Sequence, residues 1–133
     1  MKQGRAAIAV LHRHGRYFAQ RRDAAAAVLP GLWEFPGGKL EPLESPLQAL
    51  RRELEEEIHV QPATLIPLPV IAHRYPDLAL TLHPFLCEGG PEPRTRLAWG
   101  WFTARELAIL PMPPANGFLV ASLGQLAQEQ RKC

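Results

Sequence analysis

Glu53, Glu56 and Glu57 lie close together in the sequence. In a helix, which turns by about 100° per residue, they share one edge of about 100° of arc. Like charges at this spacing repel by a few tenths of a kcal/mol per pair, roughly. A hard cation such as Mg²⁺ removes that conflict, because it takes some ligands from carboxylates and the rest from water and substrate phosphates. The cluster therefore indicates metal-assisted phosphate chemistry; a solvated acidic face balanced by Arg51 and Arg52 is the alternative.

A helix with a well-marked start is predicted to carry these glutamates. Ser45 precedes Pro46, and Gln48 follows three residues after Ser45, which is the pattern of a capping box with proline at the first helical position. The apolar residues then recur in steps of three and four, which places them on one face that we expect to be buried. They are Leu47, Leu50, Leu54 and Ile58.

An apolar run, WEFPGGK, leads into the acidic helix and ends in a double glycine. Paired glycines let the backbone approach a ligand closely and adopt positive φ, so Gly38 is a candidate substrate-binding residue. Glu34 stands between two aromatic residues, and its carboxylate is either directed to solvent by strand alternation or has a functional role. Phe35 belongs either to the core or to the ligand site. Arg22, at the end of an earlier strand, either reaches a phosphate or a base edge or is a solvated arginine.

The stretch from Gly38 to Val60 resembles the signature of the Nudix hydrolases, G-x5-E-x7-R-E-U-x-E-E-x-G-U, where U is apolar. One position departs, because His59 stands where the signature has its last glycine. A residue just past a helix end commonly adopts a left-handed conformation, so we expect strain of about 1 kcal/mol there and not a loss of function. The matching positions are Gly38, Glu44, Arg52, Glu53, Leu54, Glu56, Glu57 and Val60.

The resemblance implies an α/β fold, a small α/β/α sandwich with a mixed β-sheet, in which the signature forms a loop-helix-loop. The composition of the segments agrees, because predicted strands are interspersed with two substantial helices. We expect an edge strand or an irregular connection at 64–70, where two prolines fall. The other expected strands cover residues 5–11, 16–21, 31–35, 71–75, 78–86 and 98–102.

The last part of the chain is predicted to be helical. Thr103 and Glu106 form a second capping box that opens a short helical turn. The stretch 110–116, LPMPPAN, should stop regular structure, and a helix should follow from about Gly117 to Gln130. Its expected apolar side consists of Phe118, Leu119, Ser122, Leu123 and Leu126.

Length and composition indicate one domain over residues 1–133, with an apolar fraction of 47%. A net charge of +2 is too small for binding long nucleic acid. No basic-then-apolar leader and no run near the length of a membrane span are present. Two cysteines, Cys87 and Cys133, make a disulfide framework an unfavourable interpretation. We therefore expect a cytoplasmic monomer that binds a small-molecule nucleoside triphosphate and neither membrane nor long nucleic acid.

Further similarities suggest the substrate. WEFPGGK, the PPAN element at 113–116, the length and the Tyr75-Pro76-Asp77 turn resemble the MutT-type branch of the family. Its members hydrolyse 8-oxo-dGTP and so sanitise the nucleotide pool. In that branch the asparagine of PPAN reads the purine edge, and an amide can pair bidentately with a purine. Asn116 is therefore a candidate for base recognition, with a role as cap of the last helix as the alternative. Asp77 joins the candidate substrate-binding residues.

Two features depart from the MutT-type pattern. Those enzymes also recruit a glutamate from a late loop, and no residue between 87 and 100 aligns with it; Glu92 is the nearest candidate and Glu88 a weaker one. Position 78 is leucine, where the familiar bacterial members carry a basic residue. These departures concern substrate choice more than catalysis.

The mechanism that the resemblance implies is metal-assisted hydrolysis to a nucleoside monophosphate and pyrophosphate. Mg²⁺, with Mn²⁺ as the alternative, would be held by the three glutamates of the helix and the Gly37 carbonyl, and would neutralise charge on the leaving group. Glu53 would orient or deprotonate the attacking water, which requires the metal to acidify that water. Arg52 would orient carboxylates and Lys39 would contact phosphate. Glu44 would be either a further ligand or a structural partner.

Two other functions compete with this one. A pyrimidine-directed relative acting on CTP or 5-methyl-dCTP would share WEFPGGK. A non-catalytic Nudix module would bind nucleotide, or damaged guanine in DNA, without hydrolysing it. Retention of all three helix glutamates argues against the second alternative, because a pure binder could lose them.

Overall fold

The computed structural model describes residues 1–26 and 30–131, with side chains as far as Gly124. Cys133, one of the two cysteines, therefore lies outside the described residues. The elements in chain order are β1 (Lys2–Arg13), β2 (Arg16–Arg21), β3 (Trp33–Glu34), β4 (Gly37–Lys39), α1 (Pro46–Ile58), β5 (Thr64–Pro67), β6 (Ile71–Tyr75), β7 (Leu78–Glu88), β8 (Trp99–Phe102), α2 (Ala104–Leu107) and α3 (Pro114–Arg131).

The strands form one mixed sheet in the order β3-β2-β1-β7-β5, with β4 paired to β1, β6 to β7 and β8 to β2. β1 and β7 run parallel along ten residue pairs, and the other pairings are antiparallel. The mixed sheet that we predicted is therefore confirmed, and β5 is an edge strand as its prolines indicate.

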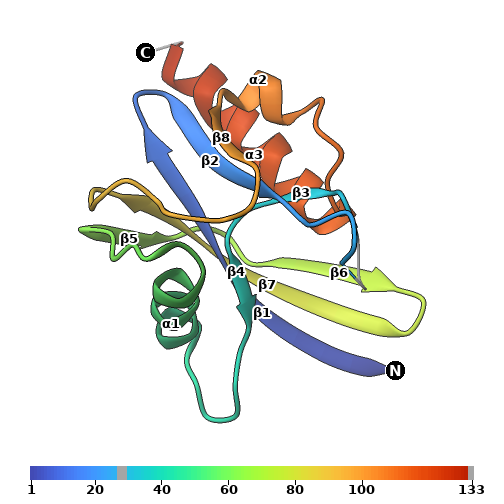
Figure 1. Ribbon diagram of the computed structural model, residues 1–133. Helices are drawn as coiled ribbons and strands as arrows, with labels where there is room; N and C mark the ends of the chain where they lie inside the picture. Colours follow the sequence, from blue (N-terminus) through green and yellow to red (C-terminus); the bar gives the residue numbers. More distant parts are fainter. Residues whose placement is uncertain (27–29, 132–133) are drawn as a thin grey trace.

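Helices cover both faces of this sheet, with α1 on one face and α2 and α3 on the other (Figure 1). β1 supplies both cores, because successive side chains of a strand point to opposite faces. Ala6, Ile8 and Val10 pack in the cluster that contains Leu119 and Leu123 of α3. The residues between them, such as Ala7 and Leu11, pack with the buried side of α1. The α/β/α sandwich is confirmed.

The helix α1 forms as its sequence predicts. The Ser45 side chain accepts a hydrogen bond from Gln48 N, and the Gln48 side chain accepts one from Ser45 N. His59 caps the far end in the left-handed conformation, with φ 57° and ψ 43°. The predicted apolar face differs at one position, because Leu47 is 39% exposed. Ala49 completes the buried face instead.

The double glycine is part of the sheet. Gly37–Lys39 pairs with Ala6 to Ile8 of β1, whereas β2 pairs with the same edge of β1 further along, at His12 and Arg13. Residues 33–36 therefore cross from β3, which is bound to β2, to β4. The expected strand at 31–35 is reduced to Trp33–Glu34, because the chain must leave β2 to make this crossing.

The last helix begins earlier than the sequence suggested. α3 starts at Pro114, within the stretch expected to interrupt regular structure, because proline fits the first turn of a helix, where its missing N–H has no partner to lose. The predicted apolar side is partly wrong: Leu119 and Leu123 are buried together with Val120, whereas Phe118 and Ser122 are exposed. Leu126 lies outside the described side chains. Within the described part of the chain, no helix has the length and apolarity that crossing a bilayer requires.

Candidate active site

The double glycine forms a close seat for two carboxylates of α1. Gly37 N donates to Glu57 Oε2 at 2.9 Å. A Cβ on Gly37, whose φ is +153°, would overlap the carbonyl oxygen of Ala7, and a Cβ on Gly38 would lie 2.5 Å from the Glu53 carboxylate. Glycine at position 37 therefore lets β4 lie against β1, and glycine at position 38 leaves room for the Glu53 carboxylate beside the backbone.

The backbone of β4 also offers a carbonyl oxygen to this site. The bonds that join β4 to β1 run from Ala9 N to Pro36 O (2.8 Å) and from Leu40 N to Arg5 O (3.0 Å). Every second residue of an antiparallel strand bonds to its neighbour, so the backbone groups of Gly37 and Lys39 face away from β1. Glu57 takes the Gly37 N–H, and Arg52 Nη2 donates to Lys39 O at 3.0 Å. The Gly37 carbonyl therefore faces away from β1 too.

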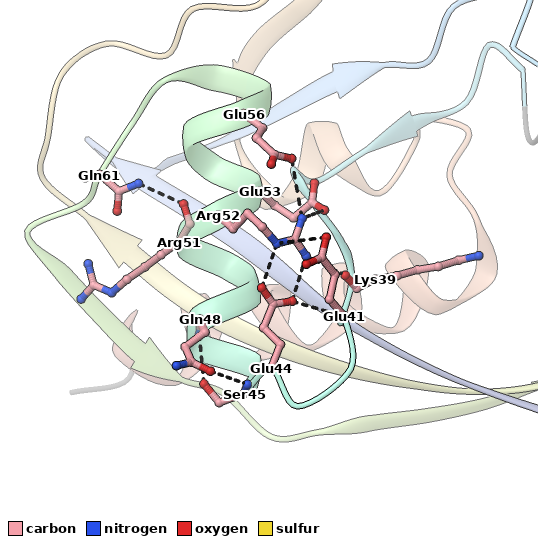
Figure 2. A network of polar contacts seen from close by, with 10 residues as sticks. All are labelled: Lys39, Glu41, Glu44, Ser45, Gln48, Arg51, Arg52, Glu53, Glu56 and Gln61. Atoms are coloured by element: carbon pink, nitrogen blue, oxygen red, sulfur yellow. Dashed lines mark hydrogen bonds and ion pairs between the residues drawn. The ribbon is translucent and has the colours of Figure 1, made fainter.

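Arg52 organises the first half of the signature (Figure 2). Its Nε and Nη2 donate to the two carboxylate oxygens of Glu44 at 2.8 and 2.9 Å, and its Nη1 donates to Glu53 Oε1 at 2.8 Å. Glu56 Oε2 lies 3.6 Å from the same Nη1. Such a bidentate pair fixes geometry as well as charge. Arg52 thus binds both carboxylate oxygens of Glu44 and holds the Glu53 carboxylate beside the double glycine.

The charges follow from these contacts. The hydrogen bonds from Arg52, and then the backbone N–H of Glu41, lower the pKa of Glu44 to about 2. The carboxylates of Glu44 and Glu53 in turn raise the pKa of Arg52. The Glu44 carboxylate is therefore ionised, and both of its oxygens already accept hydrogen bonds from the protein. This favours the interpretation of Glu44 as a structural partner of Arg52 over that of a metal ligand.

Glu57 has the opposite electrostatic environment. Burial is the main cause that raises its pKa to about 7; the nearby charges of Glu53 and Glu34 add to the rise, and the Gly37 N–H and Arg22 oppose it. An acid held so far above its usual pKa of about 4.3 is one whose charge the surroundings do not fully compensate. A cation placed beside Glu57 would supply that compensation.

The oxygen ligands present fit a hard divalent cation. Glu53, Glu57 and the Gly37 carbonyl gather at the double glycine, and oxygen is the donor that Mg²⁺ takes. They are not assembled as a metal site in this structure: no three acidic, histidine or cysteine side chains of residues 1–26 and 30–124 converge as metal ligands would. Glu53 is bonded to Arg52, and the side chain of Glu56 is 62% exposed. Assembly would require these two carboxylates to turn from the guanidinium toward the ion.

Arg22 and Glu34 form a pair at the edge of this cluster. Arg22 Nη1 donates to both oxygens of Glu34 at 3.2 and 3.1 Å. Burial raises the pKa of Glu34, whereas the charge and hydrogen bond of Arg22 lower it. The alternative interpretation of both residues as solvated side chains is therefore wrong, because they bind each other and are partly buried. Both lie close enough to Glu57 to change the pKa of its carboxyl group.

Asn116 lies on the opposite side of the sheet from α1. Its Oδ1 accepts a hydrogen bond from Phe35 N at 3.3 Å. Because Asn116 is the third residue of α3 and its Oδ1 bonds to Phe35, just after β3, rather than to its own helix, the interpretation as a helix cap is wrong. Asn116 is 8% exposed, and its amide NH₂ has no acceptor among the described residues. Since no described side-chain polar atom is fully buried without a partner, this NH₂ keeps some contact with solvent. The Phe35 side chain is 2% exposed and belongs to the core.

Several candidate residues lie elsewhere. Asp77 is at the tip of the β6–β7 hairpin, beside the pair formed by Lys2 and Leu78. Ile8, further along the same strand β1, pairs with Gly37, and the segment of β1 from Lys2 to Ile8 is about 20 Å long. Asp77 is therefore far from the double glycine. The Lys39 side chain extends away from the carboxylates (Figure 2). Both candidates for a late-loop glutamate are engaged outside the cluster: Glu92 with Trp101 Nε1 and Arg13 at 2.9 and 3.3 Å, and Glu88 with His12 at 3.3 Å.

A polar pocket that the sequence did not predict opens beside the α1 glutamates Glu56 and Glu57. It has a volume of about 530 Å³. The late loop, residues 89–98 between β7 and β8, reaches this pocket because Arg94 N donates to Ile58 O, at the end of α1, at 2.9 Å. No local pattern indicates this contact between distant parts of the chain. The pocket is lined by Glu56, Glu57, His59, Arg94, Thr95 and Arg96.

Comparisons with known proteins agree with this architecture. The sequence matches the family model described as NUDIX domain over residues 6–122. It is 32% identical over 129 residues to an 8-oxo-dGTP diphosphatase of Escherichia coli strain K12, covering 95% of this chain and 100% of that protein. An 8-oxo-dGTP diphosphatase of Proteus vulgaris is 43% identical over 81 residues, which cover 61% of this chain and 71% of that protein.

Two further comparisons concern the substrate and the fold. A CTP pyrophosphohydrolase of Escherichia coli strain K12 is 44% identical over 61 residues, covering 46% of this chain and 44% of that protein. The crystal structure of a MutT NUDIX hydrolase from Burkholderia pseudomallei has a TM-score of 0.80 at 27% identity, covering 91% of this chain and 98% of that one.

Proposed function

The chain belongs to the NUDIX domain family, and on that premise we propose that it hydrolyses 8-oxo-dGTP to 8-oxo-dGMP and pyrophosphate, and so removes an oxidised nucleotide from the pool. The observation that carries the proposal is the seating of Glu53 and Glu57 over the double glycine, with Arg52 holding Glu53 in place. The curated relatives named 8-oxo-dGTP diphosphatase support the choice of substrate.

The residues of α1 have distinct roles in this mechanism. Glu53, Glu56, Glu57 and the Gly37 carbonyl would hold Mg²⁺ or Mn²⁺, which would neutralise phosphate charge and acidify the attacking water. Glu53 orients or deprotonates that water. Arg52 positions Glu53, and Glu44 positions Arg52 through the bidentate bond.

Around this centre, other side chains bind the nucleotide. Arg22 is close to Glu57 and offers a guanidinium to a phosphate, while Glu34 holds Arg22 in place. Gly38 lets the phosphates approach the backbone. Lys39, which is exposed, is a candidate phosphate contact if its side chain turns toward the carboxylates. Asp77 has no part in this arrangement, because about 20 Å of β1 separates it from the double glycine.

Asn116 is the proposed reader of the base. Its Oδ1 is anchored by Phe35 N, so the amide plane is fixed and the open NH₂ can donate to a purine oxygen or nitrogen. Phe35 contributes to base recognition only through its backbone N–H, which holds Asn116, since its side chain is in the core.

Hydrolysis of CTP or 5-methyl-dCTP is the second candidate, because the CTP pyrophosphohydrolase matches this chain at 44% identity over 61 residues. That function would keep the carboxylate chemistry and change only the base pocket. A non-catalytic recognition module is the third candidate; the presence of Glu53, Glu56 and Glu57 disfavours it.

A substrate panel separates the three candidates. Pyrophosphate release is measured with 8-oxo-dGTP, dGTP, dATP, CTP and 5-methyl-dCTP in the presence of Mg²⁺. We expect kcat/KM to be highest for 8-oxo-dGTP. A preference for cytosine nucleotides would replace the proposed substrate by the second candidate, and binding without turnover of any nucleotide would support the recognition module.

We also propose that the protein is a cytoplasmic monomer folded as one domain over residues 1–133. Its net charge of +2 supports a small nucleotide and not long nucleic acid as the ligand.

A further inference from the structure

The late loop places two arginines beside the acidic cluster. Arg94 and Arg96 line the pocket of about 530 Å³ together with Glu56 and Glu57 of α1. The MutT-type resemblance implies a glutamate in this loop. What the loop presents to the cluster is positive charge.

The loop is built to hold these arginines in place. Arg94 N donates to Ile58 O at 2.9 Å, which fixes the loop to the end of α1. The Thr95 hydroxyl donates to Oε1 of Gln20 at 3.0 Å and accepts from Leu97 N at 3.1 Å. Gln20 is 1% exposed and pairs with Glu34 across β2 and β3. Thr95 is therefore tied to the buried sheet, and the arginines on either side of it remain at the pocket.

The two guanidinium groups have no acidic partner among the described residues. Both residues are exposed, and the described arginines that form ion pairs with carboxylates are Arg13, Arg16, Arg22 and Arg52. Guanidinium groups bind phosphate oxygens through paired N–H donors. Two of them that share a pocket and have no carboxylate of their own form a receptor for an anion that carries several charges.

We propose that Arg94 and Arg96 form an anion subsite that binds the phosphates distal to the nucleoside and retains them as pyrophosphate after cleavage. This inference rests on the proposed function for its nucleotide. The position of the subsite follows from the pocket, which places the arginines beside Glu57 and hence beside the double glycine. Glu34 pairs with Gln20, and Arg22, which directly follows β2, bonds to Glu34. A phosphate chain running from Arg22 past Glu57 would end at Arg94 and Arg96.

The test is calorimetric titration with inorganic pyrophosphate, first without divalent ion and then with Mg²⁺. The variants are Arg94→Gln, Arg96→Gln and the double substitution. Arg51→Gln is the matched control, because Arg51 is an exposed arginine of α1 that does not line the pocket. We expect each pocket variant to weaken the pyrophosphate Kd by about tenfold, the size of one lost charged hydrogen bond, whereas the control changes it less than twofold. An unchanged Kd in the double variant, or no binding to the wild type, overturns the subsite.

Kinetics separates this proposal from the proposed function. If wild type hydrolyses 8-oxo-dGTP but the pocket variants keep its KM and the pyrophosphate inhibition constant, the subsite is wrong and the function stands. If pyrophosphate binding depends on both arginines but no nucleotide is turned over, the function is wrong and the subsite stands. Thermal unfolding of every variant checks that the exposed substitutions leave the fold intact.

Discussion

Glu57 is held close to the backbone of Gly37, where burial and two neighbouring carboxylates make its negative charge unfavourable. Its neighbour Glu53 is neutralised differently, by a hydrogen bond from Arg52. The two glutamates therefore lie beside the double glycine in different electrostatic surroundings. The raised pKa of Glu57 makes its charge sensitive to pH near neutrality.

A pH dependence of stability follows from Glu57. Its pKa of about 7 in the folded chain lies above the usual value, so the folded state binds more protons and loses stability as pH rises from about 4.5 to 7. Without divalent ions, Glu57→Gln should therefore be more stable than wild type at pH 8, by about 2–3 kcal/mol, and the gain should shrink at pH 5. Urea denaturation in EDTA measures this, with the exposed Glu55→Gln as control. A gain independent of pH would contradict the account of Glu57.

At the scale of elements, α1 could be predicted because its determinants are local. Ser45, Pro46 and Gln48 define its start, and His59 occupies the left-handed position at its end. The packing of the first turn of α3 and the path of the late loop could not, since they depend on contacts between distant residues, such as Asn116 with Phe35 and Arg94 with Ile58.

The end of α1 carries strain that glycine would relieve. His59 has φ 57°, a conformation that costs a residue with a Cβ about 1 kcal/mol or more. His59→Gly should raise stability by about 1 kcal/mol, or Tm by about 3–4 °C in a domain of this size. His59→Ala is the matched control, because it keeps the Cβ and should bring no such gain. Thermal unfolding that shows equal Tm values for the two variants would argue against strain at this position.

The first turn of α3 should control base preference. Asn116→Ala removes the open amide donor and the acceptor for Phe35 N. We expect the preference for 8-oxo-dGTP over dGTP, as a ratio of kcat/KM values, to fall by about tenfold, the value of one to two kcal/mol of base discrimination. Ser122→Ala, on the exposed part of the same helix, is the control. An unchanged ratio with Asn116→Ala would favour a base pocket elsewhere and strengthen the cytosine-directed candidate.

At the scale of the whole molecule, the sheet brings two distant chemistries together. The carboxylates come from α1 on one face and Asn116 from α3 on the other, and they meet where residues 33–36 cross from β2 to β1. Gly37 and Phe35 lie two residues apart on that crossing. The cluster of glutamates and the double glycine could be predicted from their spacing. Their distance from Asp77 could not, because the sheet register decides it. Their proximity to Arg94 and Arg96 could not either, because the contact of Arg94 with Ile58 decides it.

The central claim is that the carboxylate of Glu53 drives hydrolysis at the double glycine. The most direct measurement is the single-turnover rate of pyrophosphate release from 8-oxo-dGTP with Mg²⁺, compared between wild type, Glu53→Gln and Glu55→Gln. Loss of the base and of one metal ligand should slow Glu53→Gln by at least about a hundredfold, with Glu55→Gln near wild type. A Glu53→Gln enzyme that retains the wild-type rate, while its fold and nucleotide binding are unchanged, would contradict the mechanism.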